Sequence, residues 1–373
     1  MTADVPTRID QVIPSFAGRD AIGQHTLRLR DMLRTEGFGS EIFYVSASAD
    51  VEGEGRPLEE LGDADEAGRW LLYQLSIGSH AAEVFARRPE RKLVNYHNIT
   101  PVELLRRWEP EVGEEVRVGR SQLSMLAPLT AFAIAVSAYN ERELIDAGYA
   151  TTAVAPLLID YQALVTEPDR ATSRRLAEER SGGGADLLFV GKVGPHKAEH
   201  DLIMALAAYR RLYDPQARLR IVGGGLGTAY PAAVERFAEA AGVGGAVEFA
   251  GSVTHEQLVA YYRACDVFVC LSEHEGFCVP LVEAMAHRLP VVAYGAAAVP
   301  DTVGDAGLLL PSKDPALVAA AVRRVVGDAS LRSVLAEAEI ARVEELSLAR
   351  SQARTVEVIR QAVSAAGCAV SAS

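Results

Sequence analysis

Leu271-Ser-Glu-His-Glu-Gly-Phe-Cys-Val-Pro-Leu-Val-Glu283 is the stretch around which the sequence is organised. The β-branched apolar run 266–270 comes directly before it and predicts a buried strand. Pro280 is placed for the first turn of a helix, where its missing N–H is not needed, and Pro290 ends that helix. The stretch therefore predicts a strand that runs through a loop into a helix N-terminus.

That helix N-terminus is a candidate phosphate site. Backbone N–H groups at the start of a helix have no partner within it and suit an anion. The groups in question belong to Gly276, Phe277, Cys278 and Val279. Glu275 and Glu283 bracket them, and each can accept hydrogen bonds from hydroxyls of a ligand whose phosphates lie between. Taken alone, two such glutamates can also be a loop charge and a first-turn acid favoured by the helix dipole.

The same stretch resembles the Glu-x7-Glu motif of the retaining glycosyltransferases of family 4, which have the GT-B fold. Gly-Phe-x-x-Pro lies between the two glutamates, and the resemblance continues through residues 284–293 and 304–307. It implies an α/β protein of two doubly wound, Rossmann-like domains that face each other across a cleft. It also implies that Glu283 binds the ribose hydroxyls of a nucleotide and that Glu275 binds hydroxyls of the transferred sugar.

The length of the chain, 373 residues, is too great for one ordinary domain and predicts two. The polar segment 161–185 ends in three glycines and is the expected connection between them. We expect an acceptor-binding domain at residues 1–165 and a nucleotide-sugar-binding domain at 166–347. The GT-B pattern implies that a last helix, at about 348–366, packs back on the first domain.

Composition narrows the possible partners. The net charge is −13 and neither half of the chain is basic, which argues against a nucleic-acid partner. No apolar run is long enough to span a bilayer, and no signal peptide is recognisable, although contact with a membrane surface stays possible. The four cysteines lack the spacing of metal ligands, and we expect no cofactor. Three of them lie near predicted buried strand or loop positions, which suits reduced thiols in a cytoplasmic protein. The four are Cys265, Cys270, Cys278 and Cys368.

Lysine is rare in this chain, which has 33 arginines and 4 lysines, yet Lys192 and Lys197 lie close together. They belong to the loop Gly191-Lys-Val-Gly-Pro-His-Lys197, between a predicted strand at 186–190 and a helix. This loop resembles the family's Gly-Arg-…-Lys-Gly loop, whose two cations bind the donor pyrophosphate. Lys192 replaces the usual Arg and loses its bidentate fork, and Ala198 replaces the usual Gly. The alternative is two solvated surface lysines.

Three other residues follow predicted strands, where parallel α/β sheets form their ligand crevice. Gly23 begins a helix after the strand at 9–14 and can let a phosphate or sugar approach the backbone. His97 follows the strand at 92–96, and a histidine in a matching place in the family implies a substrate contact. Val253 lies in a turn whose backbone groups meet the nucleotide base in the family, and Thr254 is expected to cap the next helix.

Asp63-Ala-Asp65 resembles the Asp-x-Asp motif that holds the metal in the other glycosyltransferase fold. That site needs a preceding buried strand, which the sequence lacks, so we expect a solvated loop there. Lys192, Lys197 and about half a unit charge from the helix dipole are expected to balance a diphosphate. The sequence therefore predicts transfer without a metal ion.

The function implied is that of a hexosyltransferase. The family moves a sugar from a nucleotide diphosphate with retention, by a front-face displacement in which the leaving phosphate helps deprotonate the acceptor. The segments 97–101 and 195–197 resemble those of bacterial polysaccharide and O-antigen mannosyltransferases, which makes GDP-mannose the first candidate donor and a UDP-sugar the next. The acceptor is a hydroxyl of a glycan, a lipid-linked glycan or a small natural product.

Two alternatives remain open from the sequence. A GT-B sugar-nucleotide epimerase would share the cleft, and a catalytically silent protein would bind a nucleotide sugar without transfer. The first should lack the Glu-x7-Glu loop and the second should lose lysines or glutamates, whereas all four residues are present here. Nothing in the sequence predicts the oligomeric state.

Overall fold

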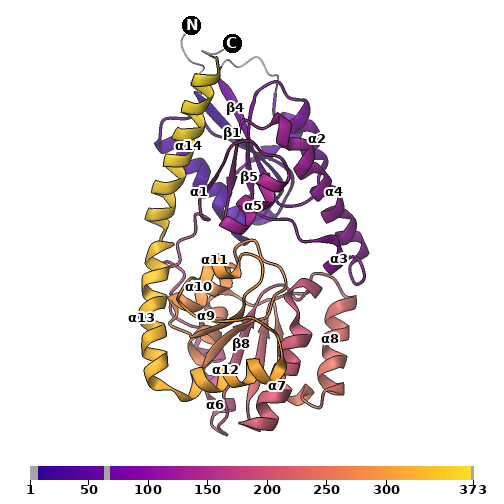
Figure 1. The fold of residues 1–373 in the computed structure, drawn as a ribbon, viewed down its shortest axis with the longest axis vertical. Coiled ribbons are helices and arrows are strands. Elements are labelled where there is room, and N and C mark those ends of the chain that lie inside the picture. The colour runs from indigo at the N-terminus through magenta and orange to yellow at the C-terminus, as the bar shows by residue number, and fades with distance from the viewer. Residues whose placement is uncertain (1–6, 63–67, 371–373) are drawn as a thin grey trace. The chain divides into compact units, whose positions relative to one another are not determined.

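The computed structural model describes the backbone of residues 7–62 and 68–370, and side chains as far as residue 364. The chain divides into two compact units (Figure 1). Unit 1 comprises residues 1–102, 114–159 and 346–373, and unit 2 comprises residues 103–113 and 160–345. Each unit is a parallel α/β domain, so the expected fold class is confirmed.

Unit 1 contains a seven-stranded parallel sheet in the order β3-β2-β1-β4-β5-β6-β7. The direction of winding reverses between β1 and β4, which are neighbours in the sheet but not in sequence. Its elements, in chain order, are β1 Arg8–Phe16, α1 Ala21–Thr35, β2 Ile42–Ala47, β3 Arg56–Pro57, β4 Arg69–Leu75, α2 His80–Arg87, β5 Arg91–Tyr96, β6 Phe132–Ala135, α5 Ala138–Asp146, β7 Thr152–Val154 and α14 Leu348–Val370.

Helix α14 comes from the far end of the sequence and completes the core of unit 1. Its residues Val358 and Ile359 are buried in one cluster with Ile9 of β1 and Leu29 of α1. Arg354 Nε of α14 donates to the carbonyl oxygen of Val154, the last residue of β7, at 3.0 Å. The last 28 residues, 346–373, are therefore part of the first unit although they follow the second in sequence.

Unit 2 contains a six-stranded parallel sheet in the order β10-β9-β8-β11-β12-β13. Helices α7 and α12 pack on each other beside the sheet (Figure 1). The elements are α6 Arg170–Arg180, β8 Asp186–Val190, α7 Glu199–Leu212, β9 Arg218–Val222, α8 Ala229–Ala240, β10 Val247–Gly251, α9 His255–Ala264, β11 Val267–Cys270, α10 Val279–Ala286, β12 Val291–Tyr294, α11 Val299–Val303, β13 Leu308–Leu310, α12 Pro315–Gly327 and α13 Ala329–Glu345.

The winding of unit 2 reverses between β8 and β11, which are adjacent and parallel. Ligands of open α/β sheets bind outside the carboxyl ends of the strands at such a switch point. The loops that follow these two strands are 191–198 and 271–278. They are the two loops in which the sequence placed the lysines and the Glu-x7-Glu motif.

A short excursion of the chain, residues 103–113, also belongs to unit 2. It includes the end of α3 Val102–Leu105 and the beginning of α4 Pro110–Leu126. Trp108 packs against the core of unit 2 and meets the ring of Tyr230 edge-on, with ring centroids 5.5 Å apart. Sequence reasoning assigned this excursion to the first domain, because its packing partners lie more than a hundred residues later in the chain.

The segment expected as the interdomain connection, 161–185, begins next to the boundary between the two units and contains the helix α6. Asp169 caps α6 by accepting from Thr172 N at 2.7 Å, and Leu176 is buried. The structural division falls at 159/160, whereas the sequence placed it at 165/166. The expected cap of α9 is confirmed, because Thr254 and Gln257 form a reciprocal capping box.

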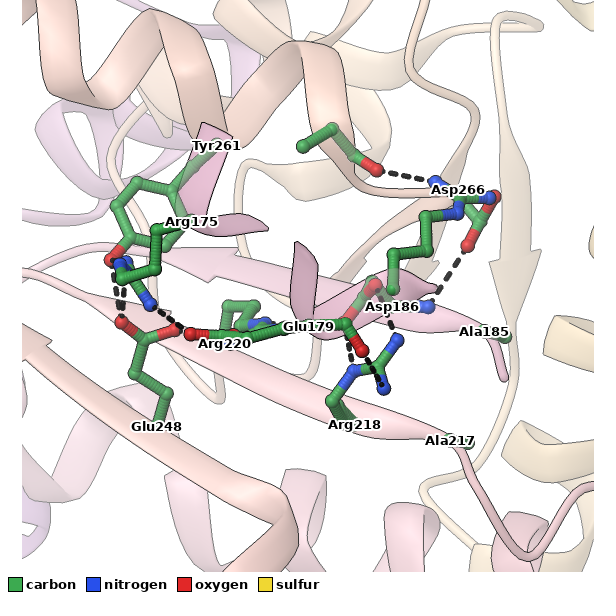
Figure 2. A network of polar contacts seen from close by, with 12 residues as sticks. Arg175, Glu179, Ala185, Asp186, Ala217, Arg218, Arg220, Glu248, Tyr261 and Asp266 are labelled. Atoms are coloured by element: carbon green, nitrogen blue, oxygen red, sulfur yellow. Dashed lines mark hydrogen bonds and ion pairs between the residues drawn. The ribbon is translucent and has the colours of Figure 1, made fainter. Parts of the chain in front are cut away.

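A network of ion pairs crosses the amino-terminal side of the sheet in unit 2 (Figure 2). Asp186, at the start of β8, accepts from Arg218 Nε at 2.8 Å and from Arg220 Nη2 at 3.0 Å. Arg220 also lies 2.5 Å from a carboxylate oxygen of Glu179 and 2.6 Å from one of Glu248. Arg220 and Asp186 are both buried, so each depends on these partners.

Asp186→Ala should lower the free energy of unfolding of unit 2 by about 3 kcal/mol. Removing one partner of a buried ion pair costs about 3–5 kcal/mol, and Arg220 keeps two other carboxylates. Urea unfolding followed by Trp108 fluorescence in a Trp70→Phe background reports on this unit alone. Glu114→Ala, which breaks an exposed pair with Arg117, is the control and should change the midpoint little. Equal effects of the two substitutions would contradict the role given to the network.

Candidate functional site

The loop after β11 presents a row of free backbone donors. Within the described ranges, the N–H groups of Gly276, Phe277, Cys278 and Val279 donate no hydrogen bond. The loop is held from behind, where Thr302 Oγ1 donates to the carbonyl oxygen of Phe277 and Ala298 N donates to that of Glu275 at 3.2 Å. The carbonyl groups are thus used internally while the N–H groups stay available, as an anion site requires.

The N-cap of α10 has an unusual backbone. Cys278 occupies this position with φ 67° and ψ 69°, in the left-handed region, and Pro280 lies in the first turn as predicted. A non-glycine residue in that region carries a steric cost of about 1–2 kcal/mol. The conformation lets the chain leave the buried Phe277 and enter the helix within one residue. Sequence reasoning gave no sign of it, since cysteine has no preference for this region.

Lys197 and Glu275 form an ion pair across the switch point of the sheet, with Lys197 Nζ 2.7 Å from Glu275 Oε1. Both side chains are largely buried, at 16% and 7% exposure. Burial by itself raises the pKa of Glu275, but the charge and hydrogen bond of Lys197 outweigh it and hold that pKa below its usual range. Burial likewise acts to lower the pKa of Lys197, and Glu275 reverses the direction. The pair is therefore fully ionised at neutral pH.

The loop that carries Lys197 ends in a left-handed residue as well. Residues Pro195–Lys197 form a turn of 3₁₀ helix, and Ala198 follows with φ 55° and ψ 44° as the N-cap of α7. Glycine adopts this conformation without steric cost, which explains physically why the related loop has glycine there. In this chain the Ala198 side chain is completely buried in that conformation.

Lys192 lies in the same loop as Lys197. Its side chain is exposed, and it makes no hydrogen bond or ion pair with any described residue. The loop itself is fixed by the next one: Val193 N donates to the carbonyl oxygen of Gly224 at 2.9 Å. Gly223 has φ +142°, and a Cβ there would lie 2.0 Å from the carbonyl oxygen of Gly191. The predicted tight turn at 223–227 is thus a glycine-dependent support for the lysine loop.

Glu283 lies on α10 and is half-buried. Tyr262 donates its hydroxyl to Glu283 Oε2 at 2.8 Å, and the ring of Tyr262 stacks on His287 at 5.1 Å. Burial raises the pKa of Glu283, against the lowering by the Tyr262 hydroxyl and by His255. One carboxylate oxygen is therefore engaged by Tyr262, and the other has no hydrogen-bond partner among the described residues. Tyr262 was missed from the sequence, because it lies 21 residues before its partner.

Gly23 and Val253, the two remaining residues predicted to contact the donor, lie in different units. The N–H of Gly23 donates to Asp20 Oδ1 at 2.6 Å, and a Cβ on Gly23 would lie 1.7 Å from the carbonyl oxygen of Ala17. Packing inside unit 1 therefore explains this glycine, and its contact with a donor stays a prediction. Val253 is half-exposed in the turn before α9, and that turn meets the glycine loop through Gly223 N and the carbonyl oxygen of Gly251 at 2.9 Å.

His97 ends a directional chain of hydrogen bonds in unit 1. Gln11 Nε2 donates to the carbonyl oxygen of Thr26 at 3.1 Å, and Gln74 Nε2 donates to Gln11 Oε1 at 2.6 Å. Gln74 Oε1, at 2.6 Å from His97 Nε2, is thus left as an acceptor. His97 must carry its proton on Nε2, because a carbonyl oxygen can only accept.

The consequence is a bare acceptor on the other ring nitrogen. His97 is 8% exposed, and its Nδ1 is buried without a hydrogen-bond partner among the described residues. Burial, helped by the neighbouring His25, lowers the pKa of His97 well below its usual range, so the ring stays neutral. A neutral imidazole with a free Nδ1 suits a hydroxyl donor and does not suit a phosphate.

Glu199, at the start of α7, is a buried acid that the sequence did not single out. It is completely buried, its Oε1 accepts from Gly194 N at 3.3 Å, and the Tyr230 hydroxyl also interacts with its carboxyl group. Burial raises the pKa of Glu199 to about 8, against lowering by backbone amides and Lys197. Glu199 is thus mostly protonated at neutral pH and holds the lysine loop through Gly194.

The remaining residues that the sequence analysis named are located as follows. Asp63 and Asp65 lie outside the described residues, and so does the side chain of Cys368. Helices in the described ranges all fall short of the length and apolarity needed to cross a membrane. The structure brings Lys197 and Glu275 together at the free N–H groups of the 271–278 loop, with Glu283 on the helix that follows. His97 and Gly23 belong to unit 1.

Comparison with known proteins agrees with this geometry. Residues 173–342 match the family described as glycosyl transferases group 1. Curated relatives include the D-inositol 3-phosphate glycosyltransferases of Kineococcus radiotolerans, 33% identical over 245 residues, and of Geodermatophilus obscurus, 36% identical over 214 residues. These alignments cover 60% and 54% of this chain, and 55% and 46% of the relatives. The chain thus spans about half the length of the curated relatives it matches.

Solved structures resemble the chain over nearly its full length. The Anabaena protein HepE in complex with UDP and glucose has a TM-score of 0.74 at 17% identity, covering 95% of this chain and 100% of HepE. Sucrose-phosphate synthase from Thermosynechococcus elongatus has a TM-score of 0.72 at 18% identity, covering 96% and 100%. At these identities the likeness shows the fold. The chain has the GT-B fold, and the resemblance noted in the sequence is confirmed.

The tautomer of His97 can be tested by ¹⁵N NMR of the imidazole ring. Nε2 should show the shift of a protonated nitrogen and Nδ1 that of an unprotonated one. Neither should titrate from pH 8 down to pH 5, since burial lowers the pKa. Gln74→Leu removes the acceptor and should allow a second tautomer. A proton on Nδ1 in the parent protein would contradict the proposed direction of the hydrogen-bond chain.

Glu199→Gln should stabilise the protein increasingly as pH rises. A carboxyl whose folded pKa is raised contributes stability that is complete below its ordinary pKa, 4.5, and that is lost as pH rises through about 8. Over that window the parent should lose up to about 1.4 kcal/mol per pH unit relative to the variant.

Urea midpoints measured between pH 5 and pH 8.5 give the difference between the two proteins. Other groups, including the buried Glu339, titrate in both and cancel. Glu114→Gln on an exposed helix face is the control, and its difference from the parent should not grow in this way. A constant difference for Glu199→Gln would mean that Glu199 is ionised in the folded protein.

Proposed function

We propose that this chain, whose residues 173–342 match the glycosyl transferases group 1 family, transfers a hexose from a nucleotide-diphosphate sugar to a hydroxyl acceptor with retention of configuration. The observation that carries the proposal is the ion pair of Lys197 and Glu275 beside the free N–H groups of residues 276–279. A cation, an ionised carboxylate and an anion site then lie together at the switch point of one sheet.

The leaving diphosphate gains negative charge as the bond to the sugar breaks, and its stabilisation is the main electrostatic task. The N–H groups at the start of α10 and the ammonium of Lys197 are the donors that we assign to it. The ion pair changes the charge balance expected from the sequence, because Glu275 already neutralises Lys197. Lys192 and about half a unit from the helix dipole are then the uncompensated positive charge.

Glu275 is suited to positioning the sugar. Lys197 keeps it ionised and holds one of its oxygens, so the carboxylate can accept hydrogen bonds from sugar hydroxyls but is a weak base. Its place directly before the N-terminus of α10 puts it on the phosphate side of a bound sugar. We therefore assign deprotonation of the acceptor to the leaving phosphate, in a front-face displacement.

Glu283 and the turn at Val253 are assigned to the nucleoside. Tyr262 occupies one carboxylate oxygen of Glu283 and orients the group, which leaves the other oxygen for the ribose hydroxyls. Because this contact is the same in the ground and transition states, it contributes to donor affinity more than to turnover. The backbone around Val253 is proposed to meet the base.

The acceptor is proposed to be a hydroxyl compound, and His97 is assigned to a substrate hydroxyl through its free Nδ1. The donor candidates are GDP-mannose and UDP-sugars. UDP-glucose belongs in the test because HepE has been solved with it, and D-inositol 3-phosphate belongs among the acceptors because it is named for the curated relatives. Transfer is proposed to need no metal ion, and a cytoplasmic location remains a prediction.

The deciding experiment incubates the protein with each donor and an acceptor panel, with EDTA present, and follows nucleotide release and product formation. Transfer with an anomeric centre of the donor's configuration, read from the proton coupling by NMR, supports the proposal. An inverted product would contradict the assignments of Glu275 and of the leaving phosphate. A changed sugar without acceptor would indicate an epimerase, and binding without turnover would indicate a silent binding protein.

Lys197→Ala should lower kcat/KM for transfer by at least about tenfold, because a hydrogen bond to a charged group is worth about 1.5–3 kcal/mol. The substitution also leaves Glu275 as an unpaired buried charge, which by itself destabilises the fold. Lys197→Met/Glu275→Gln is the matched control: it removes both charges and should recover the thermal stability but not the activity. Recovery of activity in the double variant would mean that Lys197 serves only to neutralise Glu275.

A further inference from the structure

Two thiols flank the ion pair of the candidate site. Cys270 is the last residue of β11, Cys278 is the N-cap of α10, and Glu275 lies between them in the loop. The two sulfur atoms and a carboxylate oxygen of Glu275 all lie within 4.8 Å of one another. Cys270 is completely buried, and Glu275 and Cys278 are 7% and 9% exposed. The spacing of the cysteines in sequence does not suggest this cluster.

We propose that Cys270, Cys278 and Glu275 form a binding site for a thiophilic divalent cation, of which Zn²⁺ is the type. Two sulfur ligands and one carboxylate oxygen are a donor set that suits Zn²⁺ and disfavours Mg²⁺ and Ca²⁺, which prefer oxygen ligands. Cys278 has a left-handed backbone at the N-cap of α10, and its sulfur lies within 4.8 Å of that of Cys270 at the end of β11. A role in cation binding would account for the strained backbone at this N-cap.

The geometry requires only a small adjustment. A point equidistant from three atoms 4.8 Å apart lies about 2.8 Å from each, and Zn²⁺ binds sulfur at about 2.3 Å and carboxylate oxygen at about 2.1 Å. Rotation of the three side chains can close this difference. The hydroxyl oxygen of Ser272 lies 3.3 Å from Cys270 Sγ, and Ser272 or a water molecule is the fourth ligand that we assign.

The charges of the neighbourhood also fit. Binding replaces the two thiol protons, so that Zn²⁺, two thiolates and one carboxylate carry a net charge of −1 and two protons are released. The ammonium of Lys197, which contacts Glu275 at 2.7 Å, is the counter-charge for that surplus. Lys197 can keep one carboxylate oxygen while the cation takes the other. The complex is then neutral without any group from outside the site.

The cation would act as an inhibitor. It occupies the carboxylate that we assign to the sugar hydroxyls and fixes the loop whose N–H groups are assigned to phosphate. This consequence rests on the proposed function, whereas cation binding does not. A protein with the site filled should bind the nucleotide-sugar donor more weakly than the metal-free protein.

The test is a titration of the full chain, prepared metal-free under a non-chelating reductant, with Zn²⁺ in competition with a chromophoric chelator. One equivalent should bind, and Cys270→Ser or Cys278→Ser should weaken it at least about 100-fold. Cys265→Ser is the matched control, because Cys265 is also buried but lies outside the cluster. With Co²⁺ in place of Zn²⁺, a thiolate-to-metal charge-transfer band should appear in the parent and in Cys265→Ser alone.

Thermal unfolding shows whether each serine variant is folded, and the cobalt spectrum reports on the ligands directly. The proposal is overturned if the parent fails to bind Zn²⁺, or if Cys270→Ser and Cys278→Ser bind it as tightly as the parent does. So does a thiol count that is low before metal is added and is recovered with reductant, which would show that the two cysteines form a disulfide. Stoichiometric Zn²⁺ binding in a protein without transfer activity supports the site and contradicts the proposed function only.

Discussion

The ion pair between Lys197 and Glu275 is the interaction on which the candidate site depends. It joins the loops after β8 and β11, which follow adjacent strands at the reversal of the sheet. Each partner is buried enough to be costly alone, so each holds the other in its charged form. The pair therefore holds the two loops together at this edge of the sheet and keeps both groups charged.

Close backbone contacts hold the loop that carries Lys197 in place. Gly223 leaves no room for a side chain against the lysine loop, and Glu199 reaches back to Gly194 from the start of α7. Two non-glycine residues, Ala198 and Cys278, adopt left-handed conformations at the N-caps of the helices that follow the two loops. Strain of this kind persists only where the surrounding packing determines it, and it collects at functional sites. In this chain it lies on both sides of the ion pair.

Unit 1 also contains buried polar groups that determine one arrangement. A chain of hydrogen bonds through Gln11 and Gln74 places the proton of His97 on Nε2. Buried polar groups of this kind specify one arrangement because every donor must find an acceptor. The chain starts at a backbone carbonyl, which cannot reverse its role, and ends at an unpaired nitrogen. Two other groups are similar, because their neighbours leave one hydrogen-bonding site free. They are Glu283, which Tyr262 holds by one oxygen, and the loop N–H groups before α10.

The sequence by itself determined the fold class, most of the strands and helices, and the loops that carry the site. Those features are local, because hydrophobic periodicity, caps and prolines act within a few residues, and the 271–283 motif is contiguous. Only the tertiary structure decided that Lys197 meets Glu275 and Lys192 does not, that Tyr262 holds Glu283, and that residues 103–113 belong to unit 2. It also brought Cys270 and Cys278 together around Glu275. Some of these features are contacts between elements far apart in sequence, and others are turns with rare backbone angles. They depend on the order of the strands in the sheet, and no local sequence pattern encodes that order.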